Sequence, residues 1–187
     1  MKKINLAIVG VTGAVGQEFL KLIEERQFPF ANLKMLASSR SAGKQIDFMG
    51  KTYTVEETTE NSFDGVDIAL FAGGKASKVF APAAVKAGAV AIDNSSTFRM
   101  DPDVPLVVPE VNPDAISKHH GIIANPNCST IIMVMALKPL YDLSKIRRIV
   151  VSTYQAVSGA GREGMDELKT QLENLARGEE ITPKILP

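Results

Sequence analysis

The stretch INLAIVGVTGAVG, residues 4–16, decides the fold, because it joins a short apolar run to three spaced glycines, Gly10, Gly13 and Gly16. The run has the length of a strand, and residues 14–25 carry apolar side chains at helical spacing. Glycines between a strand and a helix permit a tight turn, and the amide groups at the start of such a helix attract a pyrophosphate. We therefore predict a strand, a phosphate-binding turn and a helix. Because the spacing is GxxGxxG, not the commoner GxGxxG, a plain strand-to-helix turn is the alternative.

Further short apolar runs of strand length follow at residues 33–37, 66–71 and 89–92, and a helical stretch leads up to Lys86. Strands that are apolar throughout and alternate with helices indicate a parallel sheet covered on both faces. Residues 45–57 alternate in polarity and predict a polar hairpin or an edge excursion. The predicted fold class is therefore α/β, with a Rossmann-like, doubly wound parallel sheet.

The pattern changes in the second half of the chain. Five prolines within residues 93–127 indicate a loop-rich connection. A helix is predicted over residues 128–141, and its apolar side chains lie on most of its faces, which indicates burial. Residues 146–157 are predicted to form a long strand, and residues 163–176 an amphipathic helix. We place the boundary between two domains directly before the first of these helices.

The composition excludes several classes of function. The 187 residues include 21 basic and 21 acidic side chains and no tryptophan, which argues against a nucleic-acid or membrane-surface partner. A single cysteine excludes an intramolecular disulfide and a multi-cysteine zinc site. The amino-terminal apolar run breaks at glycines, and no run approaches the roughly 18 apolar residues of a membrane span. We expect a cytoplasmic protein with a small-molecule substrate and with no metal, membrane or nucleic-acid partner.

The loop after the second predicted strand indicates which cofactor binds. Its sequence is SSRSAGK, residues 38–44, and it contains no carboxylate. A dinucleotide-binding fold usually carries Asp or Glu at this point, which accepts hydrogen bonds from the ribose hydroxyls of NAD. Hydroxyls and a guanidinium suit the 2′-phosphate of NADP instead, because Arg offers fixed donors to a dianion. We therefore predict NADP(H), with an ordinary polar loop as the alternative.

Cys128 lies in the turn NPNCST, residues 125–130, directly before a predicted helix. The dipole and the unpaired N–H groups at a helix start stabilise a thiolate, which makes such a cysteine a usable nucleophile. A buried, inert cysteine is the alternative. A thiolate beside a nicotinamide indicates a hemithioacetal or thioester that exchanges hydride with the cofactor.

Six segments in this order and spacing closely resemble the aspartate-β-semialdehyde dehydrogenase family, and the resemblance covers the whole chain. N-acetyl-γ-glutamyl-phosphate reductase shares the opening segment, but there a glycine normally precedes the cysteine, and Asn127 favours the aspartyl enzyme. The most specific of the six are the cysteine turn and the last segment. The six segments are GVTGAVG at 10–16, SSRSAGK at 38–44, DNSSTFR at 93–99, VPEVN at 108–112, NPNCST at 125–130 and TYQAVSGAG at 153–161.

The resemblance implies NADPH-dependent reductive dephosphorylation of β-aspartyl phosphate to aspartate semialdehyde and phosphate, on the route to lysine, methionine and threonine. It implies an NADP-binding domain at 1–127, the beginning of an α+β catalytic and dimerisation domain at 128–187, and a homodimer or homotetramer at full length. Cys128 resembles the acyl-thioester nucleophile, Gln155 the residue that orients the acyl group, and Arg99 the residue that holds the phosphate. The matching cofactor contacts are Gly10, Thr12, Gly13, Ala14, Val15, Ser38, Arg40, Ser41, Ser158 and Gly159.

Some of these roles have plain alternatives. Arg99 could form a surface salt bridge, and residues 158–159 could be an ordinary loop. The family's general base and its substrate-carboxylate arginine lie downstream of the positions present here, and His119 and His120 do not match the base motif, so we expect them in a solvent-facing loop. The chain then resembles the amino-terminal half of the enzyme, with negligible turnover by itself and exposed apolar surface on its last two helices. A non-catalytic nucleotide-binding or assembly module is the second hypothesis.

Overall fold

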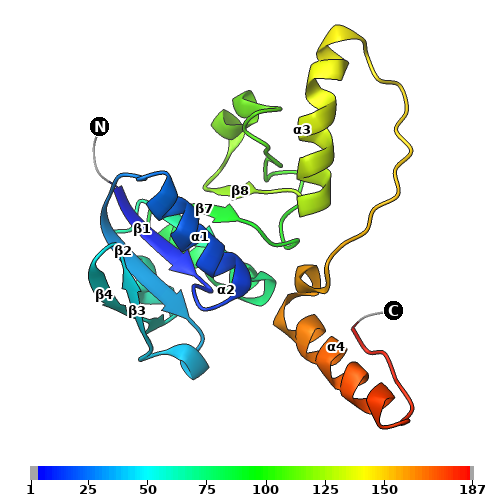
Figure 1. Cartoon of the computed structure of the whole chain (residues 1–187). Coiled ribbons are helices and arrows are strands. Elements are labelled where there is room, and N and C mark those ends of the chain that lie inside the picture. The colour runs from blue at the N-terminus through cyan, green and yellow to red at the C-terminus, as the bar shows by residue number, and fades with distance from the viewer. Residues whose placement is uncertain (1–3, 186–187) are drawn as a thin grey trace. The chain divides into compact units, whose positions relative to one another are not determined.

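The computed structural model describes residues 4–185, which form two compact units that divide between Arg147 and Arg148 (Figure 1). The described part of the first unit contains a parallel sheet, a hairpin and three α-helices, and that of the second contains one α-helix, besides short 3-10 helices in both. The helices are α1 Ala14–Glu25, α2 Gly74–Lys86, α3 Cys128–Leu143 and, in the second unit, α4 Gly161–Ala176.

The sheet has the strand order β5-β2-β1-β6-β7-β8, and its neighbouring strands run parallel. From β1 the chain passes to β2 on one side and later to β6 on the other, so the strand order reverses at β1. The carboxyl edge at such a switch point is the usual ligand crevice of open α/β sheets. The predicted doubly wound parallel sheet is confirmed. The bounds are β1 Ile4–Val9, β2 Phe30–Ala37, β5 Glu56–Glu57, β6 Ile68–Phe71, β7 Val90–Asp93 and β8 Ile122–Ala124.

Strand β1 is apolar throughout because both of its faces are buried. Leu6 and Ile8 belong to a core cluster that includes side chains of α1, and Ala7 and Val9 belong to a second cluster that includes side chains of α2. Successive side chains of a strand point to opposite faces of the sheet, so the two clusters lie on the two faces. This two-sided burial explains why the run shows no alternation of polarity.

The predicted hairpin is confirmed as an antiparallel pair, β3 (Gln45–Phe48) and β4 (Lys51–Thr54). Its two-residue turn places Met49 at φ 49° and Gly50 at φ 74°, the backbone conformation that tight hairpin turns require. Phe48 is buried and stacks on Phe30 of β2, with 6.4 Å between the ring centroids. The hairpin thereby extends the core on the α1 side of the sheet.

Two sequence-based predictions are wrong for this structure. Residues 146–157 were expected to form a long strand, yet residues 145–156 have no regular secondary structure, and Tyr154 is fully exposed. A strand needs a neighbour to pair its N–H and C=O groups, and the described part of the second unit contains no strand. Helix α3 was expected to be buried, but none of its residues is, and Ile132 and Leu143 are 72% and 86% exposed. Strand β8 lies within the segment expected to be a loop-rich connection of short extended pieces, and its pairing with β7 was not predicted.

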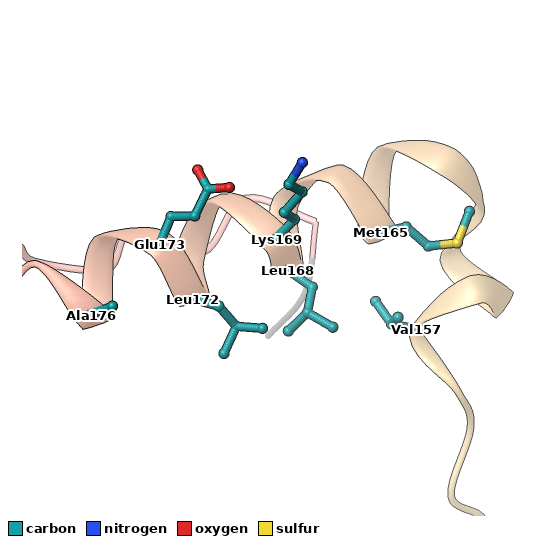
Figure 2. Close-up of a pocket in the computed structure, with 7 residues that line it drawn as sticks. All are labelled: Val157, Met165, Leu168, Lys169, Leu172, Glu173 and Ala176. Carbon is teal, nitrogen blue, oxygen red and sulfur yellow. The ribbon is translucent and has the colours of Figure 1, made fainter.

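The second unit is built around α4, which begins after the short helix η4 (Val157–Ala160). Its apolar side is open, and Figure 2 shows the seven residues that line a groove of about 450 Å³ along it. Leu172 and Leu175 of α4 are exposed, as are Ile132 and Leu143 of α3, which confirms the expectation of exposed apolar surface on these two helices and overrides the burial that the pattern of α3 alone indicated. The lining comprises Val157, Met165, Leu168, Lys169, Leu172, Glu173 and Ala176.

Gly16 is required by the packing of α1 against the turn that precedes it. A Cβ at this position would overlap the carbonyl oxygen of Gly10 and would lie 2.6 Å from the Cα of Val11. We expect Gly16→Ala to lower the free energy of unfolding by about 1–3 kcal/mol through overpacking, although Ala favours a helix over Gly by about 1 kcal/mol. Urea unfolding followed by circular dichroism measures the change.

Gly73→Ala is the matched control for this substitution. A Cβ at Gly73 meets no atom within 4 Å, and the φ of −145° is open to any residue. Gly73 is the N-cap of α2, where Gly is preferred to Ala, so we expect a small loss of unfolding free energy, of about 0.5 kcal/mol, and no overpacking. Equal losses in the two variants would contradict the packing role of Gly16.

Candidate functional site

The glycine turn lies between β1 and α1 and is hydrogen-bonded to the end of β2. Gly10 has a φ of +83°, and its N–H and that of Val11 donate to the carbonyl of Leu36 at 2.8 and 3.1 Å. The helix cap is Gly13, which has no side chain to accept from the first amides of α1. Ala14 is exposed there. Uncapped, accessible N–H groups at a helix start form an anion site.

The loop after β2 contacts this turn. Residues Ser39–Ser41 form the short helix η1, and the hydroxyl of Thr12 donates to that of Ser41 at 3.3 Å. Ser38 and Arg40 are exposed, and Ser41 is half-buried. The structure thus brings two of the three predicted cofactor-binding segments together at the carboxyl ends of β1 and β2.

Sequence reasoning missed the carboxylates of β5. Glu56 and Glu57 pair with Leu36 and Ala37 at the end of β2, and β5 also contacts η1. Both glutamates are exposed. They follow β2 by about twenty residues of chain and reach this edge only because the hairpin returns the chain to β2, so local sequence gave no signal for them.

Cys128 is the first residue of α3 and is exposed, so the alternative of a buried cysteine is wrong for this structure. Asn127 caps the helix, because its side-chain oxygen accepts from the N–H groups of Ser129 at 3.0 Å and Thr130 at 3.3 Å. The cap fixes the beginning of the helix at the cysteine. The predicted turn and helix start are therefore confirmed, and the positive end of the helix dipole lies at the thiol.

Arg99 connects two loops at the same edge. Its Nε donates to the carbonyl of Asn125 at 2.8 Å, and its Nη2 donates to the carbonyl of Asn94 at 3.1 Å. A guanidinium has five N–H groups, so these contacts leave capacity to hold an anion as well. Nearby, the Oδ1 atom of Asn125 is buried and has no hydrogen-bond partner among residues 4–185. A buried acceptor of this kind is normally satisfied by a ligand or an ordered water.

The remaining predicted site residues belong to the second unit. Gln155 is exposed, and its side chain lies against Gly159, where an added Cβ would overlap the amide. Ser158 is exposed and lies in η4. Both residues, with Gly159, belong to the second unit, whereas Cys128 belongs to the first.

The two histidines precede β8, whereas Cys128 follows its carboxyl end. His120 is exposed, as expected for a solvent-facing loop. His119 is half-buried, and its Nδ1 accepts the N–H of Gly121 at 2.9 Å. The two histidines therefore lie at the opposite end of β8 from the thiol. Among the described residues there is no metal-binding cluster of three or more His, Cys, Asp or Glu side chains.

The geometry of the first unit defines a Rossmann-type dinucleotide-binding domain, with a glycine turn at the switch point of a parallel sheet. Comparison with family models identifies it further. The chain belongs to the semialdehyde dehydrogenase family: residues 5–119 match its NAD binding domain, and residues 137–187 match its dimerisation domain. No helix within residues 4–185 is long and apolar enough to cross a membrane.

Individual relatives agree with this assignment. The chain is 60% identical to an aspartate-semialdehyde dehydrogenase of Aquifex aeolicus (strain VF5) over 95% of its length and 53% of the relative's. The crystal structure of aspartate semialdehyde dehydrogenase II complexed with ASA from Vibrio cholerae matches with a TM-score of 0.90, at 50% identity, over 100% of this chain and 56% of that one. A structure of the Candida albicans enzyme with NADP matches with a TM-score of 0.66, at 29% identity, over 78% of this chain and 48% of that one. The chain spans about half the length of the curated relatives it matches, and the resemblance found in its sequence is confirmed.

The cap of α3 is testable by substitution of Asn127. We expect Asn127→Ala to destabilise the first turn of α3 by about 1 kcal/mol, because the amides of Ser129 and Thr130 lose their acceptor. Amide hydrogen exchange at these two residues, measured by NMR, should become faster. Asn127→Ser is the control, since Ser caps helices about as well as Asn. Unchanged exchange in Asn127→Ala would show that the cap does not hold this turn.

Proposed function

We propose that the whole protein is an NADP-dependent aspartate-semialdehyde dehydrogenase that forms an acyl-thioester on Cys128. The observation that carries the proposal is the place of the thiol relative to the switch point. The glycine turn follows β1 and Cys128 follows β8, with β6 and β7 between them. Three strand spacings of about 4.8 Å separate them by roughly 14 Å along one edge. The glycine turn would hold the pyrophosphate of a dinucleotide and the loop after β2 its adenosine, which would leave the nicotinamide for the side of the edge where Cys128 lies.

The residues at the β2 side fit such a cofactor. A Cβ at Gly13 would lie 3.3 Å from the carbonyl oxygen of Gly10, so the turn itself leaves little space for a side chain at this position. Thr12 and Ser41 are joined by a hydrogen bond, and Arg40 is exposed beside them. An exposed guanidinium and hydroxyl groups suit a 2′-phosphate. The NADP complex of the Candida albicans relative supports this choice.

The chain's own residues then act as follows. The thiolate of Cys128 attacks the acyl carbon of β-aspartyl phosphate, the bond from that carbon to the phosphate oxygen breaks, and phosphate leaves. Arg99 holds the phosphate with the guanidinium N–H groups that do not contact Asn94 and Asn125. Gln155 orients the acyl group. Bound NADPH supplies the hydride that reduces the thioester carbon, after which the carbon–sulfur bond breaks and the sulfur takes a proton.

Assembly and domain organisation follow the same proposal. Residues 1–127 form the NADP-binding domain and residues 128–187 begin the catalytic and dimerisation domain. The match of residues 137–187 to a dimerisation domain supports a homodimer or homotetramer. The relatives are named for aspartate semialdehyde, and the resemblance of the sequence to that family implies that this aldehyde supplies the synthesis of lysine, methionine and threonine.

Arg40 tests the cofactor preference. We expect Arg40→Ala to weaken NADPH binding about tenfold or more, because a charge-assisted hydrogen bond contributes roughly 1.5–3 kcal/mol, and to leave NADH binding nearly unchanged. Isothermal titration calorimetry of both cofactors measures the difference. Arg26→Ala is the matched control, since Arg26 is an exposed arginine at the far end of α1. Equal losses of affinity for both cofactors would contradict the preference for NADPH. Glu57, beside the end of β2, would then be the candidate acceptor for the ribose hydroxyls of NAD.

Cys128 tests the reaction itself. As the only cysteine of the chain, it can be followed by mass spectrometry without ambiguity. We expect iodoacetamide to alkylate it faster at neutral pH in the folded chain than in urea, because the exposed sulfur lies at the positive end of α3, which stabilises negative charge. No residue among 1–187 matches the general base of the family, and general acid–base assistance is typically worth about 10²–10⁴-fold. We therefore expect residues 1–187 alone to reduce NADP negligibly with aspartate semialdehyde and phosphate.

Supplying the remaining half from a full-length relative should restore turnover, and Cys128→Ser should abolish it. A labelling rate no higher in the folded chain than in urea would remove the main support for a nucleophile. Full turnover by residues 1–187 alone would reopen His119 and His120 as candidate bases.

A further inference from the structure

Asp93 is a fully buried carboxylate that the proposed reaction does not use. It ends β7, and its side chain accepts hydrogen bonds from both sides. The hydroxyl of Ser77, in the first turn of α2, donates to Oδ1 at 2.6 Å. The N–H of Ser95 donates to the same oxygen at 3.0 Å, and the Ser95 hydroxyl donates to Oδ2 at 2.8 Å. The carboxylate therefore joins α2 to the loop that follows β7.

A second set of contacts extends this loop along the edge of the sheet. The Thr97 N–H donates to the hydroxyl of Ser95 at 3.1 Å, and the Thr97 hydroxyl donates to the carbonyl of Gly74 at 3.1 Å. Arg99, at the end of the loop, then holds the carbonyls of Asn94 and Asn125. Hydrogen bonds thus hold the loop at Ser95 and Thr97, and Arg99 follows Thr97 by two residues of chain, so the position of Arg99 depends on how Asp93 orders the loop.

Asp93 also contacts the segment that leads to Cys128 directly. The backbone carbonyl of Asp93 accepts the N–H of Asn125 at 2.8 Å. Asn125 is therefore held from two sides, by Asp93 through its N–H and by Arg99 through its carbonyl. Two residues further on, Asn127 caps α3 at Cys128. The beginning of α3 thus depends on the loop that Asp93 organises.

We infer that Asp93 is a positioning residue for the reaction: it orders the loop from Asn94 to Arg99 and thereby sets both the anion-binding guanidinium and the reactivity of Cys128. A buried carboxylate is costly unless it is hydrogen-bonded, and here its bonds go to the loops of the site. A residue that served stability alone could be replaced without a change at the thiol. This inference rests on the proposed function, in that Cys128 is the nucleophile.

The experiment measures the iodoacetamide alkylation rate of Cys128 at neutral pH in the folded chain, together with the urea midpoint of unfolding. Ser77→Ala and Ser95→Ala each remove one hydroxyl bond to Asp93, and Ser95→Thr keeps the hydroxyl. Thr58→Val is the matched control, because its buried hydroxyl donates at 3.0 Å to the carbonyl of Ala37, on the β2 side of the sheet. Asp93→Asn is the sharpest variant, and the serine variants keep the test decisive if it does not fold.

We expect Ser77→Ala and Ser95→Ala to slow alkylation about two- to fivefold, the range that a weakened helix-start interaction corresponds to. Ser95→Thr should keep the alkylation rate of the unsubstituted protein. Thr58→Val should lower the unfolding midpoint and leave the alkylation rate of Cys128 unchanged. Unchanged rates in both alanine variants, or an equal loss in Thr58→Val, would overturn the inference. A wild-type rate no higher in the folded chain than in urea would instead overturn the proposed function, so the two failures are distinguishable.

Discussion

Burial of the parallel sheet on both faces is the constraint on which the site depends. Side chains of β1 alternate between a cluster with α1 and a cluster with α2, so the strand is held without help from the loops at its end. Those loops can then be polar and exposed, because the layers beneath them supply the stability. The glycine turn, the loop after β2, the loop after β7 and the cysteine turn all leave this sheet at its carboxyl edge. Chemistry at the edge is therefore separated from the packing of the core.

Features written in short stretches of sequence could be predicted before the structure. The glycines after β1, the apolar runs of the central strands and the helix beginning at Cys128 each depend on neighbours within one or two turns of chain. Local spacing was sufficient for them because a strand buried on both faces and a capped helix start have their own residue patterns. The family resemblance then supplied roles that spacing alone does not contain.

Features that depend on distant partners could not be predicted in this way. Residues 146–157 have the composition of a strand but no strand to pair with among the described residues, and α3 has apolar residues on most faces but little to cover them. Burial is a property of the surroundings, not of the segment. Glu57 reaches the end of β2 only through the pairing of β5, and Arg99 meets Asn125 across 26 positions of sequence. Such contacts arise from topology, so no local pattern announces them.

Arg99 donates hydrogen bonds to two loops at once, and this limits which residues could replace it. Two N–H groups of its guanidinium donate to backbone carbonyls of different segments. The remaining N–H groups would hold an anion. Lysine keeps the positive charge but concentrates it in one small ammonium group, without the planar array of donors. A lysine could therefore attract the anion and still release the two loops from each other. The position couples charge with shape, which makes it intolerant of an exchange that is conservative almost anywhere else on a protein surface.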